Sequence, residues 1–377
     1  MLNKERVIQN FIELVSVPCP SKDERQEAEL IMRKLHEMGI EAEMDNVGEK
    51  VGGTCGNVWA YIKGRKPEAP VLFFEAHMDS VAPTTGTKVV RRDGVLYSDG
   101  TTTLGGDDKV GIAAALEAVK ALQEDNIEHG DIQLCFTIGE EIGCLGALNL
   151  DRQRIKADFG YCMDIGGPIG EIIYAAPKLY ELYVTVTGKA AHAGLEPENG
   201  INAIMLAAEA LHNLPAYGRL DEETTLNVGV FHAGVGNNVV APEAKFVIDM
   251  RSMNVTKLEH LKEDVCRIIT DTVTSGGAKV TIDVREGCPA VAIAKDHACI
   301  TLAQQAAEKM GCTAVLKTTG GCSDGNYLCG YGLPCALLAT GMSNVHTTEE
   351  YLKEEDLFGT AKWIYEIVKL AAEKNKK

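Results

Sequence analysis

The fold is decided by the stretch Val71-Leu72-Phe73-Phe74-Glu75-Ala76-His77-Met78-Asp79-Ser80. It starts as a run of apolar residues, which is typical of a strand buried on both faces. Alternate residues of a strand point to the same face, so His77 and Asp79 are expected side by side at the end of this strand. A histidine that binds a metal normally donates its other ring N–H to a carboxylate. The pair therefore indicates either a metal ligand with its orienting carboxylate or two polar residues at an exposed strand end.

The composition is that of an ordinary globular protein. The chain has 377 residues, of which 45% are apolar and 24% are charged, and it is long enough for two domains. It contains no run of about 18 apolar residues, so we expect no transmembrane helix and no membrane partner. The net charge of −17 disfavours a nucleic acid as partner, because phosphate binding needs clustered lysine and arginine. Twelve cysteines without a Cys-x-x-Cys pair, behind an N-terminus without a signal-peptide pattern, predict free thiols and a cytoplasmic location.

Helices alternate with apolar strands in the first half of the chain, which predicts an α/β sandwich with a largely parallel sheet. The pattern changes near Pro177. From there the order is β-α-β-β-α-β, which is typical of a ferredoxin-like unit. The α/β pattern resumes after Pro289. We therefore predict a discontinuous large domain, residues 1–177 and 289–377, with an inserted small domain, residues 178–288.

Polar residues lie where two further predicted strands end. Glu140 and Glu141 follow the strand at 132–138, and Asp164 follows the strand at 159–163. Two adjacent carboxylates repel each other unless they share a cation or a proton, although a solvated loop would also hold them. These strand ends are therefore candidate sites for a cation.

Two more candidates lie beside a helix and a strand. Asp107 stands directly before an alanine-rich helix, where an acidic residue is also ordinary helix capping. His346 follows the strand at 335–339. In open α/β sheets, the functional site lies at the carboxyl ends of the strands. Histidine, aspartate and glutamate without cysteine form a ligand set for zinc, manganese or cobalt, and two such ions about 3.5–4 Å apart are a known hydrolytic arrangement.

The motifs occur in an order that resembles one family over nearly the whole chain. The sequence is similar to the dizinc metallopeptidases that include peptidase T, carboxypeptidase G-type enzymes, aminoacylases and succinyl-diaminopimelate desuccinylase. The resemblance implies that the large domain is catalytic and that the inserted domain is a lid and dimerisation domain. It rests on these motifs: His77-Met78-Asp79, Gly106-Asp107-Asp108-Lys109, Glu140-Glu141, Asp164-Ile165-Gly166-Gly167, Ala191-His192-Ala193-Gly194, Asn238-Val239-Val240-Ala241-Pro242, Asp249-Met250-Arg251, Gly320-Gly321-Cys322-Ser323-Asp324-Gly325 and Asn344-Val345-His346.

The resemblance implies a centre of two zinc ions, with manganese or cobalt as alternatives. Five side chains would be ligands: His77 and Asp164 for one ion, Glu141 and His346 for the other, and Asp107 as the bridge between them. The bridge is assigned to the first of the two adjacent aspartates because the family's aspartate is followed by one residue and then lysine.

The resemblance also implies how the reaction proceeds. Glu140 would be the general base that takes a proton from a water bridging the two metals and later delivers it to the leaving nitrogen. Asp79 would orient His77. Amide hydrolysis by this route is the activity that the family's motifs predict.

Three residues of the inserted domain match the family's substrate-binding positions. His192 resembles the lid histidine that stabilises the tetrahedral oxyanion, often from the partner subunit of a dimer. Asn238 and Arg251 resemble residues that hold the carboxylate of the substrate. Two structural alternatives stay open, in which His192 caps a turn beside Gly194 and Arg251 forms an ion pair at a strand end.

The branch of the family is indicated by two motifs. The Asp-Asp-Lys run at 107–109 and Glu140-Glu141-Ile142-Gly143 resemble peptidase T, which implies a homodimeric aminotripeptidase acting on short peptides. The run at 320–325 departs from the usual Gly-Gly-(Ser/Thr)-Asp pattern, so two alternatives remain. The first is a deacylase or desuccinylase of N-acyl amino acids. The second is a non-catalytic peptide-binding protein, which is disfavoured because all five ligand positions and the base are filled.

Overall fold

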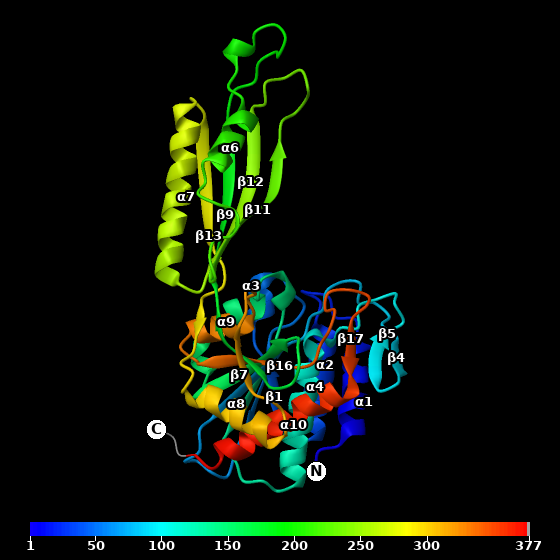
Figure 1. Cartoon of the computed structure of the whole chain (residues 1–377). Coiled ribbons are helices and arrows are strands. Elements are labelled where there is room, and N and C mark those ends of the chain that lie inside the picture. The colour runs from blue at the N-terminus through cyan, green and yellow to red at the C-terminus, as the bar shows by residue number, and fades with distance from the viewer. Residues whose placement is uncertain (375–377) are drawn as a thin grey trace. The chain divides into compact units, whose positions relative to one another are not determined.

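The computed structural model describes residues 1–374 of the chain. The chain folds into two compact units (Figure 1). Among the described residues, the large unit comprises Met1–Ala175, Ala292–Thr319 and residues 323–374, and the small unit comprises Ala176–Val291 and Gly320–Cys322. The sequence placed the boundaries at 177/178 and 288/289 and did not foresee that Gly320–Cys322 pack with the small unit. Residues 375–377 of the predicted large domain lie outside the described residues.

A nine-stranded sheet organises the large unit, in the order β1-β2-β6-β3-β7-β16-β8-β14 with β15 paired to β8. The central strands β6, β3, β7 and β16 are mutually parallel. All six residues of β3 are buried. The predicted sandwich with a largely parallel sheet is therefore confirmed. The strands are β1 (Ala42–Met44), β2 (Val58–Ile62), β3 (Leu72–His77), β6 (Ile132–Thr137), β7 (Phe159–Ile165), β8 (Glu171–Ala176), β14 (Val291–Ala292), β15 (Val315–Thr318) and β16 (Cys335–Ala339).

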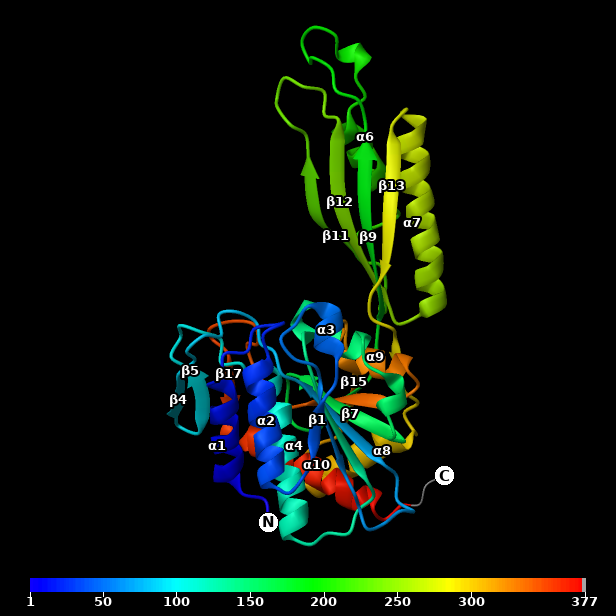
Figure 2. The same ribbon diagram turned by 180° about the vertical axis from the view of Figure 1, so that it is seen from behind.

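Helices cover both faces of this sheet (Figures 1 and 2). Tyr161 of β7 donates its hydroxyl to the carbonyl of Cys299 in α8, whereas the neighbouring Cys162 packs against Leu328 of α9. Because successive residues of a strand point to opposite faces, α8 and α9 lie on opposite sides. The α-helices are α1 (Lys4–Val15), α2 (Arg25–Glu37), α3 (Val47–Val51), α4 (Gly106–Glu124), α5 (Leu145–Leu148), α8 (Ala298–Lys309), α9 (Asp324–Gly330) and α10 (Glu354–Ala371).

A separate three-stranded sheet has the order β17-β5-β4. Its strands β4 (Val89–Arg92) and β5 (Val95–Ser98) form a short hairpin, and β17 (Tyr351–Lys353) pairs with β5 from near the far end of the chain. None of the helices within residues 1–374 combines the length and the apolar character that a membrane span requires.

The small unit is an antiparallel sheet in the order β10-β11-β12-β9-β13 with two helices. The predicted β-α-β-β-α-β order is confirmed, with the two-residue β10 as an addition. Alternating residues of β9 and β12 are buried against the helices, as expected for a sheet with one covered face. The elements are β9 (Lys178–Thr187), α6 (Ala203–His212), β10 (Gly218–Arg219), β11 (Thr224–Ala233), β12 (Glu243–Ser252), α7 (Val255–Ser275) and β13 (Lys279–Glu286).

Candidate metal centre

The candidate ligands converge at the carboxyl ends of the parallel strands of the large unit. His77 is the last residue of β3, and Asp164 is the next-to-last residue of β7. Glu140 and Glu141 form the single helical turn that follows β6. Parallel strands end at one edge of a sheet, so residues far apart in sequence meet there.

One group of possible donor atoms belongs to His77, Asp107 and Asp164, which lie within 4.8 Å of one another. The Nε2 atom of His77 is 3.3 Å from Oδ1 of Asp107 and 3.9 Å from Oδ1 of Asp164. The imidazole is buried, with 1% of its surface exposed. This group has the nitrogen and oxygen donors that suit zinc or a similar ion.

The second group belongs to Asp107, Glu141 and His346. Nε2 of His346 is 3.2 Å from Oδ2 of Asp107 and 3.0 Å from Oε2 of Glu141. Asp107 therefore offers one oxygen to each group. Its neighbour Asp108 is fully buried and accepts a hydrogen bond from the backbone N–H of Gly111 instead. The structure thus brings the five predicted ligands together, with Asp107 rather than Asp108 in the shared position.

The electrostatics of these side chains fit divalent cations. Burial, reinforced by the charges of Asp107 and Glu140, raises the pKa of Asp164 well above its usual range. Burial likewise raises the pKa of Glu141 to about 7. Oε1 of Glu141 is buried and has no hydrogen-bond partner within residues 1–374. Buried carboxyl groups with vacant lone pairs are costly unless a cation or a proton satisfies them, so the donor set fits two metal ions.

Histidines already compensate part of this negative charge. A hydrogen bond with Asp107 raises the pKa of His346 to about 9. Burial opposes ionisation of Asp107, but hydrogen bonds from His346 and His77 outweigh it and lower the pKa of that carboxyl. The shared aspartate is therefore a carboxylate that faces two imidazoles, which is the protonation state that a bridging ligand requires.

Asp79 acts on the site through two different groups of atoms. The Nδ1 atom of His77 lies 3.0 Å from the backbone carbonyl oxygen of Asp79 and 3.5 Å from its carboxylate Oδ1. The carboxylate accepts hydrogen bonds from the hydroxyl of Ser21 at 2.6 Å and from the backbone N–H groups of Glu140 at 3.0 Å and Glu141 at 3.3 Å. Asp79 thus fixes the histidine mainly through its carbonyl and fixes the Glu140–Glu141 turn through its carboxylate.

Glu140 belongs to neither of the two groups above. Burial raises the pKa of Glu140 to about 8; His77 opposes this shift, and Asp324 and Glu141 add to it. Its Oε1 accepts a hydrogen bond from the thiol of Cys144 at 3.4 Å. A carboxyl group that takes up and releases a proton near neutral pH has the property that a general base needs.

Two buried residues to which the sequence assigned no role hold the segments that carry the candidate ligands in place. Glu350 is 2% exposed, and its carboxylate accepts hydrogen bonds from the backbone N–H groups of Gly105 at 2.8 Å and Asp107 at 3.2 Å. Lys109, 1% exposed, donates from Nζ to the carbonyl of Met78 and the hydroxyl of Ser80, both at 2.7 Å. In the sequence, Glu350 could have been found as an acidic residue four positions after His346. Lys109 could have been found as the lysine that ends the motif at 106–109.

The three predicted substrate-binding residues lie in the small unit. His192 and Asn238 are neighbours, because the N–H of Ala193 donates to the carbonyl of Asn238 at 2.9 Å. Nδ1 of His192 accepts a hydrogen bond from the N–H of Gly194 at 3.2 Å, which is the turn contact that the sequence left open.

Arg251 lies near the opposite end of β12. Its guanidinium pairs with the carboxylate of Asp249 at 3.0 Å and donates from Nη1 to the carbonyl of Gly320 at 3.0 Å. The strand from Glu243 to this arginine spans about 26 Å at 3.3 Å per residue. The structure therefore brings His192 and Asn238 together and separates both from Arg251.

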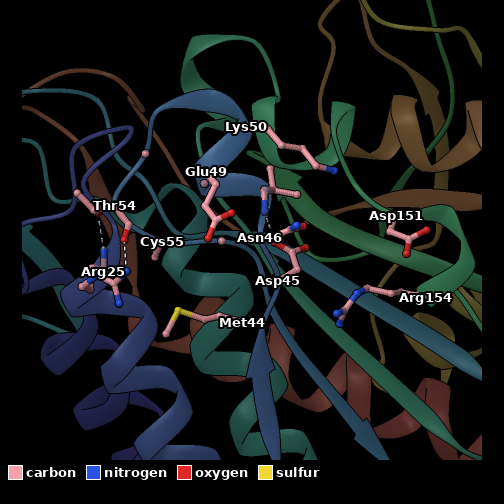
Figure 3. A pocket seen from close by; sticks show the side chains of 14 residues that line it. Arg25, Met44, Asp45, Asn46, Glu49, Lys50, Thr54, Cys55, Asp151 and Arg154 are labelled. Atoms are coloured by element: carbon pink, nitrogen blue, oxygen red, sulfur yellow. Dashed lines mark hydrogen bonds between the residues drawn. The ribbon is translucent and has the colours of Figure 1, made fainter.

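A cavity of about 570 Å³ in the large unit lies around α3 (Figure 3). It contains the carboxylate of Asp45, which accepts hydrogen bonds from the N–H of Val47 at 3.0 Å and from Nε1 of Trp59 at 2.9 Å. None of its lining residues belongs to a group of possible metal donors within residues 1–374. The cavity therefore adds no residue to the candidate metal centre.

Comparison with known proteins agrees with this geometry. The family model described as "Peptidase family M20/M25/M40" matches residues 73–370. The uncharacterized protein YqjE of Bacillus subtilis is 37% identical over 372 residues, which cover 99% of this chain and 100% of that protein. The aminopeptidase PepT from Bacillus cereus is 37% identical, with a TM-score of 0.94 and coverage of 98% and 99% of the two chains. A tripeptidase from Staphylococcus aureus is 32% identical, with a TM-score of 0.95 and coverage of 99% and 100%. The chain belongs to peptidase family M20/M25/M40.

Proposed function

We propose that this peptidase is a two-metal aminopeptidase that releases the N-terminal residue of short peptides, with tripeptides as preferred substrates. The observation that carries the proposal is the sharing of Asp107 between two groups of donor atoms. The peptide substrate class is supported by the full-length similarity to proteins named aminopeptidase PepT and tripeptidase.

We assign one ion to His77 and Asp164, the other to Glu141 and His346, and the bridge to Asp107. Zinc is the proposed metal, since nitrogen and carboxylate donors without thiol suit it, and manganese or cobalt fits the same donors. When bound, the two ions would polarise the scissile carbonyl and stabilise the negative charge that develops on its oxygen.

Glu140 is the proposed general base. Its carboxylate accepts a proton from the attacking water and then gives that proton to the leaving nitrogen, which becomes the new amine. Two contacts hold it in place for both steps: the hydrogen bond from its N–H to Asp79 and the thiol of Cys144 at its Oε1. The raised pKa of about 8 allows the same group to gain and lose the proton.

The separation of Arg251 from His192 and Asn238 favours a homodimer. Two ends of one small unit that lie about 26 Å apart along β12 cannot both contact one short peptide. We propose that the substrate carboxylate and oxyanion are held by Arg251 of one protomer together with His192 and Asn238 of the partner subunit.

The surface of the small unit supports this assembly. Strand β11 is paired with β12 along its length, but β10 covers only Thr225 and Leu226 on its other side. Beyond that point, Val230 and Phe231 are 43% and 40% exposed. Natural proteins normally protect such apolar strand edges, so a second copy of this chain is the proposed cover.

We also propose a cytoplasmic location with no nucleic-acid or membrane partner. No disulfide joins any of the twelve cysteines, which agrees with a reducing compartment. The net charge of −17 disfavours phosphate backbones.

The test is release of free amino acids from di-, tri- and tetrapeptides and from N-acyl amino acids, with added zinc, manganese or cobalt and again after chelation. We expect metal-dependent release of the first residue, fastest from tripeptides. The matched control is the same tripeptide with an acetylated N-terminus, which should react more slowly. Turnover of N-acyl amino acids alone would reject the aminopeptidase and identify a deacylase.

A further inference from the structure

A third group of possible metal donors lies beside the two-metal centre and shares no residue with it. Within residues 1–374, Glu140, Cys144 and Asp324 bring one donor atom each to within 4.8 Å of one another. They come from three elements: the turn after β6, the residue before α5, and the first residue of α9. This group differs from the others in containing a thiol.

The contacts of Asp324 leave one carboxylate oxygen of this group without a hydrogen-bond donor among the described residues. The thiol of Cys144 donates to Oε1 of Glu140 at 3.4 Å. Asp324 is 1% exposed, and its Oδ2 accepts a hydrogen bond from the hydroxyl of Thr137. Its other oxygen, Oδ1, is buried and has no hydrogen-bond partner among the described residues. A buried carboxylate oxygen without a donor is costly, and a cation would satisfy it.

The charges of the group also point to a cation. Glu140 and Asp324 are both carboxyl groups, and close carboxylates repel each other unless a proton or a cation lies between them. Glu75 adds a further buried carboxyl next to Asp324, since Thr137 contacts both. Two divalent ions held by the other two groups would use different ligands and would leave this group's carboxylates without a metal partner.

We propose that Glu140, Cys144 and Asp324 form a third, inhibitory site for a thiophilic divalent ion, zinc or cadmium. On binding, the thiol of Cys144 releases its proton to solvent and its sulfur bonds to the ion. Thiolate ligands favour zinc and cadmium over manganese and magnesium, so the site discriminates among metals. An ion there occupies the Glu140 carboxylate, which can then no longer accept a proton; this inhibition rests on the proposed function of Glu140.

The first experiment measures inhibition. Enzyme loaded with two equivalents of zinc is titrated with more zinc, or with manganese, while tripeptide hydrolysis is followed. We expect zinc to inhibit and manganese not to. Cys144→Ser and Cys144→Ala should each raise the half-inhibitory zinc concentration at least about tenfold, because even loss of a residue that only orients a ligand weakens metal binding about 10–100-fold.

The matched control is Cys55→Ser, which removes a thiol that is also buried but belongs to none of the three groups. Its half-inhibitory zinc concentration should equal that of the unmodified chain. Equal inhibition of the Cys144 variants and the unmodified chain would overturn the proposal, as would inhibition by manganese at the same concentrations as zinc.

The second experiment reports the site without turnover. Cobalt is added stepwise to the metal-free chain, and the near-ultraviolet charge-transfer band between sulfur and cobalt is recorded. The first two equivalents, held by nitrogen and oxygen, should give no band; the third should give one, and Cys144→Ala should abolish it. A missing band in the unmodified chain, or its persistence in Cys144→Ala, overturns the third site. A chain that hydrolyses no peptide overturns the proposed function instead, and the cobalt titration still decides the site.

Discussion

The large and the small unit differ in where their sheets place the candidate functional residues. In the large unit, parallel strands end at one edge, so His77, Asp164 and the Glu140–Glu141 turn meet although they are far apart in the sequence. In the small unit, antiparallel strands reverse direction, and the candidate residues fall at both ends of the sheet. The first arrangement brings the five candidate metal ligands together within one chain, whereas the second leaves Arg251 far from His192.

The two units also differ in which polar side chains they bury. Among the described residues, the buried carboxyl groups lie in the large unit, and the small unit buries only two polar side chains, Thr224 and Ser252. A buried carboxyl needs a cation, a proton or several hydrogen-bond donors. We therefore expect the reactive groups in the large unit and only substrate and subunit contacts in the small unit. Four experiments test this division, from the largest expected effect to the smallest.

Replacing Glu140 with alanine should give the largest effect. Loss of a general base lowers kcat about 10²–10⁴-fold, while the five ligands and therefore the metal content should stay unchanged. The measurements are steady-state tripeptide hydrolysis and metal analysis of the purified variant. Full activity of Glu140→Ala would contradict the proposed mechanism. Loss of the metals from this variant would indicate that Glu140 is a metal ligand and not the general base.

Replacing His192 with alanine tests whether the small unit serves the partner's site. Loss of an oxyanion donor should lower kcat about 10²–10³-fold. Mixing Glu140→Ala with His192→Ala under subunit exchange should restore activity, because one site of the hybrid dimer then has both residues. If both residues acted within one protomer, the mixture would stay inactive. Mixing Glu140→Ala with itself is the control.

Replacing Glu350 with glutamine should weaken metal binding without removing a ligand. The carboxylate of Glu350 accepts hydrogen bonds from the backbone N–H groups of Gly105 and Asp107. It also packs closely against Gly106, where an added Cβ atom would lie only 2.9 Å from its Oε1. Loss of such an orienting residue lowers metal affinity about 10–100-fold. Competition with a chelator measures this affinity. Glu354→Gln, a change of a buried glutamate that pairs with Arg91, should leave affinity unaltered.

Replacing Glu27 with glutamine should alter only the pH dependence of stability. Burial raises the pKa of Glu27 to about 8, and both its oxygens have no hydrogen-bond partner within residues 1–374. In the unfolded chain this carboxyl has its ordinary pKa of 4.5. The folded state therefore binds more protons, and the free energy of unfolding falls as the pH rises from 4.5 to about 8. Glu27→Gln should remove this loss, so its gain in stability should be largest at pH 9 and nearly absent at pH 4.5.

Urea unfolding of the metal-free chain at both pH values measures the difference. Glu29→Gln, on the same helix but with 56% of its side chain exposed, is the control and should show no such pH dependence. A stability gain of equal size at both pH values would mean that ionisation of Glu27 is not its cause.

Much of the architecture could be predicted because it is local. The apolar run at 72–77 predicts a buried strand, and the alternation in β9 predicts a strand with one exposed face. The strand β17 of the three-stranded sheet could not be predicted. Its three residues form a strand by pairing with β5, which lies more than 250 positions earlier in the chain.

The sequence by itself determined which residue types stand where the strands end, because the apolar patterns and the His, Asp and Glu motifs are written along the chain. It also determined the family, through the order of those motifs. Tertiary structure alone decided that the carbonyl of Asp79 faces His77, that Glu350 holds the turn before Asp107, and that Cys144 and Asp324 meet at Glu140. The last two contacts join groups from separate elements, and only the packing of helices against the sheet sets the distances between them. The first depends on how the backbone turns after β3.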